Sequence, residues 1–168
     1  LNIESFLSKV NPDIIINAAG VTIRRANETS IDQIIFINSL LPNILNNWSE
    51  KNNCRLIHFS TDCVFSGKKG NYKDYDITDA LDTYGKTKSL GEVNSCHALT
   101  LRSSMIGFEL YNKTELLEWV FKNQKKSING FSNVIYSGIT TQLMANIVIK
   151  MINDFTDLSG VYNISSVP

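Results

Sequence analysis

The sequence predicts an α/β fold in which helices flank a parallel sheet, and two observations lead to this prediction. Short apolar runs of strand length recur along the chain at 13–20, 56–59, 98–102 and 161–164. Between them lie longer stretches in which apolar residues repeat at helical spacing. Strands that alternate with helices form parallel sheets, because each helix returns the chain to the start of the next strand.

The first predicted helix covers residues 4–10 and ends before Asn11 and Pro12, because a proline disfavours helix at the residue before it. The run at 13–20 follows. It is continuously apolar and does not alternate, which is typical of a parallel strand covered on both faces. We therefore expect this strand inside the sheet.

Three small residues, Ala18, Ala19 and Gly20, close that first strand. Small side chains at a strand end allow a flat ligand to approach the backbone. The alternative is close packing against a neighbouring helix. The residues alone leave both interpretations open.

A long helix with one apolar stripe is expected over 31–48. Pro42 lies inside it and has no N–H to donate to the carbonyl of Asn38, four residues earlier. We expect that carbonyl to lack its helical partner and to be able to hold a water molecule. The alternative is a plain proline kink.

The second strand, 56–59, ends in three small polar side chains, Ser60, Thr61 and Asp62. In open α/β sheets, ligands bind at the carboxyl ends of the strands, so this is the expected position of a site. Asp62 could instead be a capping carboxylate in a turn.

Tyr84 and Lys88 are four residues apart, so on a helix they share one face. A tyrosine hydroxyl with its ordinary pKa near 10 is a poor acid or base at neutral pH. A lysine ammonium one turn away favours the phenolate, so we expect Lys88 to lower the pKa of Tyr84. The pair could then act in general acid catalysis. The alternative is a solvated helix face.

The later elements complete the α/β pattern. After the strand at 98–102, Asn112 and Glu115 resemble a capping box at the start of a helix. A loop and a short strand are expected within 127–137, and a further helix over 142–153.

Composition and charge exclude several classes of protein. The 168 residues include 16 basic and 16 acidic ones, without a block of five like charges, which argues against a nucleic-acid partner. Cys54, Cys63 and Cys96 are scattered and lack nearby histidines at ligand spacing, so we expect neither disulfide nor metal site. Without a long apolar run or a signal-peptide pattern, a cytoplasmic protein with no membrane partner is expected.

Two stretches, STDCVFSG at 60–67 and DTYGKTKSLGE at 82–92, carry a family resemblance. They resemble the extended short-chain dehydrogenase/reductase family, most closely its dTDP-4-dehydrorhamnose reductase branch. The resemblance implies a partial doubly wound, Rossmann-like parallel sheet with part of a small C-terminal substrate-binding region. It assigns 1–110 to the C-terminal part of a dinucleotide-binding domain that includes the catalytic residues. It assigns 111–168 to a mixed substrate-binding region with the remaining core elements.

The resemblance also implies a reaction: reduction of a nucleotide-linked 4-keto sugar by NADP or NAD cofactors, with NADPH favoured, in deoxysugar and polysaccharide biosynthesis. The catalytic residues that it implies are Thr61, Tyr84 and Lys88. The residues expected at the cofactor are Ala18, Ala19, Gly20, Asn38, Ser60, Lys88, Ser103 and Ser104. Those expected at the substrate are Asp62, Val64, Phe65 and Met105, although a bulky aromatic is common where Met105 stands. We hypothesise further that Asn38, a water molecule and Lys88 form a proton path to Tyr84.

The Thr-Tyr-Lys set serves reductases, epimerases and dehydratases of this family alike, so the neighbouring residues must decide. Dehydratases carry a glutamate after Thr-Asp as an extra acid and base, whereas this chain has Cys63, a poor substitute. Epimerases usually have small neutral residues beside the catalytic Ser/Thr, whereas Asp62 is charged. Reduction is favoured; an epimerase of the same family and a non-catalytic regulatory subunit are the alternatives.

The glycine-rich turn that seats a dinucleotide pyrophosphate in this family is missing from the sequence. Gly67 and Gly70 lie in a polar loop without a strand-to-helix setting. We therefore expect a part of a longer protein that binds its cofactor weakly or not at all by itself. The resemblance is compatible with a homodimer.

Overall fold

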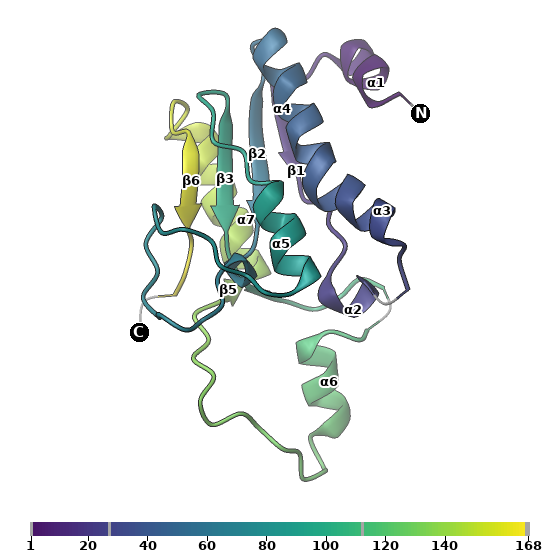
Figure 1. The fold of residues 1–168 in the computed structure, drawn as a ribbon, viewed down its shortest axis with the longest axis vertical. Coiled ribbons are helices and arrows are strands. Elements are labelled where there is room, and N and C mark those ends of the chain that lie inside the picture. Colours follow the sequence, from purple (N-terminus) through teal and green to yellow (C-terminus); the bar gives the residue numbers. More distant parts are fainter. Residues whose placement is uncertain (1, 27, 112, 167–168) are drawn as a thin grey trace. The chain divides into compact units, whose positions relative to one another are not determined.

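The computed structural model describes residues 2–26, 28–111 and 113–166. The chain divides into two compact units, Leu1–Ser103 with Asp157–Asn163, and Ser104–Thr156 with Ile164–Pro168. The first unit contains a parallel four-stranded sheet of order β1-β2-β3-β6 (Figure 1). Its strands are β1 (Ile14–Asn17), β2 (Arg55–Ser60), β3 (Ala98–Arg102) and β6 (Gly160–Asn163). The predicted α/β fold with a parallel sheet is confirmed.

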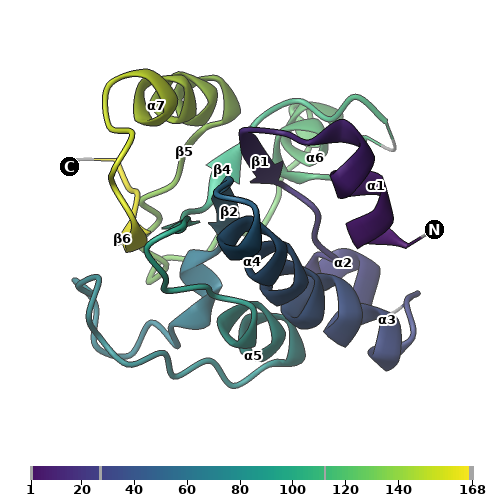
Figure 2. The ribbon, with the colours of Figure 1, turned by 90° about the horizontal axis from the view of Figure 1, so that it is seen from above.

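Helices α4 and α5 lie on the same side of this sheet (Figures 1 and 2). The amphipathic face of α4 explains its position, since its Leu45 and Trp48 are buried in one core cluster with Leu56 of β2. The helices of this unit are α1 (Ile3–Val10), α2 (Ile23–Ala26), α3 (Ile31–Ile35), α4 (Leu41–Lys51) and α5 (Thr83–Leu90). Two short segments complete it, the π-helix η1 (Phe36–Leu40) and the 3₁₀-helix η2 (Asp62–Val64).

Pro42 reshapes the predicted helix at 31–48, as its missing N–H requires. The N–H of Leu41 bonds to the carbonyl of Phe36, five residues back, so a π-helical segment separates α3 from α4. The structure thus absorbs the proline with a π-bulge in place of a plain kink. Asn38 lies in the middle of this bulge.

The second unit contains β4 (Met105–Ile106), β5 (Ile139–Thr140), α6 (Leu116–Asn123) and α7 (Thr141–Asn153). The prediction of a short strand within 127–137 is wrong. The strand forms later in the chain, as β5, which pairs with β4. The predicted capping box is also wrong. It requires Glu115 at the third position of the helix, whereas Glu115 is the N-cap residue of α6. Asn112 lies outside the described residues. None of the helices in the described ranges has the length and apolar character needed to span a membrane.

Candidate active site

Thr61 follows β2 directly and caps the 3₁₀-helix η2. Its Oγ1 accepts a hydrogen bond from the N–H of Cys63 at 3.2 Å and donates to the carboxylate of Asp62 at 3.3 Å. Thr61 is buried, whereas Asp62 is half-buried. The turn therefore fixes the threonine hydroxyl at the carboxyl end of the sheet.

Helix α5 brings Tyr84 and Lys88 to the same place. It begins at its N-cap Asp82, whose carboxylate accepts the N–H of Gly85 at 2.9 Å. Tyr84 lies close enough to the Thr61 side chain for that hydroxyl to lower the pKa of the phenol. The three residues implied in catalysis thus lie on one strand end and one adjacent helix.

The pKa of Tyr84 is raised above its ordinary value, so the expectation that Lys88 lowers it is wrong for this structure. Burial of the phenol is the largest cause, and the negative charges of nearby acidic groups, among them Asp62 and Asp82, act in the same direction. Only the nearby hydroxyl of Thr61 acts in the opposite direction. Tyr84 is therefore a protonated phenol at neutral pH.

Lys88 is buried in the sheet-facing side of α5, and its ammonium donates to the carbonyl of Phe59 at 2.7 Å. Burial lowers the pKa of Lys88 from 10.5 to about 8, while the charge of Glu92 opposes this shift. Within the described residues no carboxylate lies within ion-pair distance of this ammonium. The lysine is thus a desolvated cation close to its titration point.

Two glycines allow α5 to approach its neighbours closely. A Cβ at Gly85 would collide with the carbonyl of Cys63 and the side chain of Ala80. A Cβ at Gly91 would collide with the backbone carbonyl of Asn38. Any side chain at either position would push the Tyr84–Lys88 helix away from the strand end or from the π-bulge.

Asn38 connects the first strand end to α5 through its side chain. Its Oδ1 accepts the N–H of Val21 at 2.8 Å, and its Nδ2 donates to the Val21 carbonyl at 3.1 Å and to Thr87 Oγ1 at 3.2 Å. Its backbone carbonyl packs against Gly91. These contacts give Asn38 a structural role, and the proposed proton path to Lys88 stays a hypothesis.

The small residues after β1 are exposed, as a ligand-binding strip requires. Ala18, Ala19 and Gly20 all have accessible surface. A Cβ at Gly20 would meet only Asn38 Oδ1 at 3.7 Å and Lys88 Nζ at 4.0 Å, both ordinary contact distances. Close packing therefore does not require a glycine at this position, and the ligand contact predicted for the three residues stays a prediction.

The serines predicted at the cofactor have other contacts in the structure. Ser60 is buried, and its hydroxyl donates to Glu92 at 2.8 Å. Ser103 is buried as well. Ser104 belongs to the second unit, where its carbonyl accepts the N–H of Ile139 at 3.0 Å. The cofactor roles of these serines stay predictions.

The residues predicted at the substrate differ in accessibility. Val64 has no accessible surface, and this argues against the substrate contact predicted for its side chain. Phe65 is half-buried and stacks on Tyr72 with ring centroids 4.2 Å apart. Met105 is exposed and lies in the second unit.

Sequence reasoning missed a buried ion pair, Glu92 with Arg102, which lies next to Ser60. A signal was available in the sequence. Arg102 ends an apolar strand, and a charged residue in such a run requires a buried partner. The glutamate that closes the DTYGKTKSLGE stretch is that partner.

Comparison with known proteins extends along almost the whole chain. The family model described as the RmlD substrate binding domain matches residues 1–164. A dTDP-4-dehydrorhamnose reductase from Aggregatibacter actinomycetemcomitans is 29% identical over 174 residues, 98% of this chain and 59% of that protein. The spore coat polysaccharide biosynthesis protein SpsK of Bacillus subtilis is 28% identical over 162 residues, 92% of this chain and 56% of that protein.

A solved structure agrees with the fold. The crystal structure of a hypothetical dTDP-4-dehydrorhamnose reductase from Sulfolobus tokodaii matches with a TM-score of 0.83 and 27% identity, over 97% of this chain and 59% of that one. The chain therefore spans somewhat less than three fifths of the length of these relatives.

Proposed function

The chain belongs to the RmlD substrate binding domain family, and on this premise we propose that it carries the catalytic residues of an NAD(P)H-dependent reductase. The substrate is a nucleotide-linked 4-keto sugar of the dTDP-4-dehydrorhamnose type, and the pathway is deoxysugar and polysaccharide biosynthesis. The names of the two relatives support the substrate and the pathway. The observation that carries the proposal is that the three side chains lie together. Thr61 is close enough to Tyr84 to act on its phenol, and Lys88, one turn along α5, donates to the carbonyl of Phe59, two residues before Thr61.

In this mechanism Tyr84 is the general acid. When the carbonyl carbon of the sugar is reduced, its oxygen gains negative charge and takes the phenolic proton of Tyr84. Thr61 Oγ1 donates a hydrogen bond to the same oxygen. The raised pKa of Tyr84 keeps the phenol protonated at neutral pH, which is the state that a proton donor needs.

Lys88 acts on the cofactor and on Tyr84. A bound nicotinamide cofactor supplies the hydride. Ala18, Ala19 and Gly20, beside Lys88, would hold its flat ring system, and the Lys88 ammonium would bind the nicotinamide ribose. Because the pKa of Lys88 is about 8, most of the lysine is charged at neutral pH and stabilises the phenolate left on Tyr84 after proton transfer.

The test is an assay of the protein in its full natural length with NADPH or NADH and a panel of nucleotide-linked keto sugars. We expect cofactor oxidation with one 4-keto sugar, matched mole for mole by the reduced sugar. Interconversion of sugars without net consumption of cofactor would indicate an epimerase. Absence of turnover with every sugar would favour a regulatory subunit.

The assembly and the location of the protein stay predictions. The family resemblance is compatible with a homodimer, and light scattering of the full-length protein measures its mass in solution. A cytoplasmic location is expected as well, and cell fractionation measures it.

A further inference from the structure

A buried ion pair lies beside the candidate active site. Arg102 Nε is 2.7 Å from Glu92 Oε1, and Arg102 Nη2 is 2.7 Å from Oε2, so the guanidinium binds the carboxylate with two parallel hydrogen bonds. The exposed fractions of the two side chains are 6% for arginine and 9% for glutamate. This two-point geometry fixes orientation as well as distance.

Two segments of the first unit, the end of β2 and the loop after η2, are joined to this pair. Ser60, at the end of β2, donates to Glu92 Oε1 at 2.8 Å. The third nitrogen of Arg102, Nη1, donates to the carbonyl of Asp74 at 3.0 Å. The guanidinium carbon also lies 4.9 Å from the ring centroid of Phe65. The pair therefore connects two strand ends, the segment just after α5 and the loop that follows η2.

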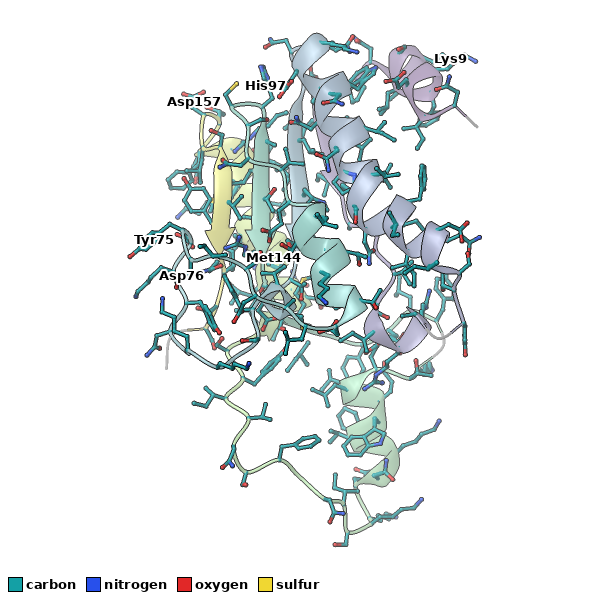
Figure 3. The ribbon with its side chains drawn as sticks, in the orientation of Figure 1. Lys9, Tyr75, Asp76, His97, Met144 and Asp157 are labelled. Carbon is teal, nitrogen blue, oxygen red and sulfur yellow. The ribbon has the colours of Figure 1, made fainter. Side chains whose placement is uncertain are left out.

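Further contacts fasten that loop at the end of β6. The carboxylate of Asp74 accepts the N–H of Asn163 at 2.6 Å, and Asn163 Nδ2 donates to the carbonyl of Tyr72 at 3.2 Å. Tyr72 in turn stacks on Phe65. The next part of the loop is outside this network, since Tyr75 is 85% exposed and lies near the carboxyl end of β6 on its outer side (Figure 3).

Stability alone is a poor explanation for such a pair. Removing two charges from water costs several kcal/mol per ion, and apolar replacements are often equally stable. Arg102 makes all its described polar contacts to the segments that surround the site. If the Glu92–Arg102 pair orients these segments, both its burial and its position beside the site are explained.

We propose that the Glu92–Arg102 pair is a positioning element of the reaction centre. Through Ser60 it holds Thr61 in register with α5, and through Asp74 it fixes the loop beside the site. This inference rests on the proposed reductase function and adds two positioning residues to it. Neither residue touches the reacting atoms.

The charge of Glu92 also reaches Lys88, which gives the proposal a specific signature. Glu92 raises the pKa of Lys88 against the effect of burial. Two further titratable groups lie near Lys88 in the described part of the chain. Tyr84, one turn earlier on α5, has a raised pKa and keeps its proton, and burial together with Lys88 lowers the pKa of His58 of β2 to about 3. His58 is therefore neutral at working pH, and Glu92 is the group whose removal lowers the pKa of Lys88 further.

The first variant is Glu92→Gln in the full-length enzyme. We expect kcat to fall about 10- to 100-fold, because small displacements of positioned groups have effects of this size. We also expect the alkaline limb of the pH profile of kcat/KM to move to lower pH. Lys69→Met is the matched control, since its exposed ion pair with Asp76 lies in the same loop, and it should change neither quantity.

A double variant, Glu92→Gln with Arg102→Met, separates positioning from stability, because it leaves no unpaired buried charge. A positioning role predicts a folded protein, by thermal unfolding, that keeps the low kcat and the displaced alkaline limb. Recovery of both wild-type kcat and the wild-type limb would overturn the proposal.

Ser60→Ala gives the test that does not depend on the folding of the double variant. If Ser60 connects the ion pair to Thr61, kcat falls while KM for NADPH is unchanged. If Ser60 instead contacts the cofactor, KM for NADPH rises at constant kcat, and the proposal is overturned.

A readout without catalysis separates this proposal from the proposed function. Titration of ¹³C-labelled lysines by NMR, with Lys88 assigned from Lys88→Met, measures the pKa of Lys88 directly. A lower pKa of Lys88 in Glu92→Gln supports the electrostatic link even if no keto sugar is reduced, in which case only the reductase function fails. An unchanged pKa overturns the link in an active or an inactive protein.

Discussion

Two buried cations beside the same strand ends have opposite surroundings. Arg102 and Lys88 have exposed fractions of only 6% and 4%. Arg102 is bound by both carboxylate oxygens of Glu92, whereas the ammonium of Lys88 meets the carbonyl of Phe59. The arginine is fully paired, and the lysine is not.

The difference indicates different tasks. A guanidinium cannot lose its proton in a protein, so pairing makes Arg102 a fixed connection between segments. Lys88 has a pKa of about 8, close to working pH, so its charge responds to its neighbours. Arg102 is suited to holding segments in place, and Lys88 is suited to a role in the reaction.

The largest effect is expected for Tyr84, which acts in the reaction together with Lys88. Tyr84→Phe should lower kcat about 100- to 10,000-fold, because general acid catalysis contributes effects of this size. The thermal unfolding temperature should change little. Tyr75→Phe is the control, since that tyrosine is 85% exposed on the loop. If Tyr84→Phe keeps wild-type turnover, the phenol is not the acid.

The second prediction concerns the pH dependence of stability. Burial lowers the pKa of Lys88 in the folded state, so between about 8 and 10.5 the unfolded chain binds more protons. The contribution of Lys88 to the free energy of unfolding should therefore rise across this window, by on the order of 3 kcal/mol. Denaturant titrations at several pH values should show that Lys88→Met lacks this rise. Parallel curves for the two proteins would contradict the desolvated state of Lys88.

The third prediction concerns the close approach of α5. Gly91→Ala should lower the free energy of unfolding by about 1 to 3 kcal/mol and reduce kcat, because the new methyl group collides with the Asn38 carbonyl. Gly130→Ala is the control, since a Cβ at Gly130 would meet nothing within 4 Å. Equal stability of the two variants in urea titrations would show that α5 is not held at this contact.

The smallest effect is expected for the exposed pair Lys69–Asp76, which sharpens the contrast with Glu92–Arg102. The Lys69 ammonium is 2.6 Å from the Asp76 carboxylate, yet the lysine side chain is 57% exposed. Water and salt screen such pairs. Asp76→Asn should leave kcat and the unfolding temperature unchanged within error, and a loss of turnover would place this outer part of the loop in the reaction centre.

The sequence predicted the fold from the periodicity of its apolar residues, and the family resemblance implied that Thr61 and Tyr84 lie together. Strand ends of a parallel sheet share one edge, and residues four apart share a helix face. It predicted the wrong direction for the pKa of Tyr84. Spacing shows that Lys88 is near, but burial and the acidic neighbours that raise the pKa depend on tertiary packing.

Other features also required three-dimensional contacts. Ser60 and Glu92 are 32 residues apart, and no local pattern joins them. The disturbance at Pro42 was predictable, whereas its form, a π-bulge that puts the Asn38 carbonyl on Gly91, depends on how α5 packs. No pattern in the neighbouring residues indicated that the side chain of Val64 is fully buried.

The most direct test of the reductase centre uses NADPH labelled with deuterium at the transferred position. The full-length protein is incubated with labelled cofactor and a nucleotide-linked 4-keto sugar, and the sugar is analysed by mass spectrometry and NMR. We predict one deuterium on the former carbonyl carbon, now an alcohol, and none with Tyr84→Phe over the same time. Unlabelled isomerised sugar, or keto sugar recovered unchanged by the wild type, would contradict the account.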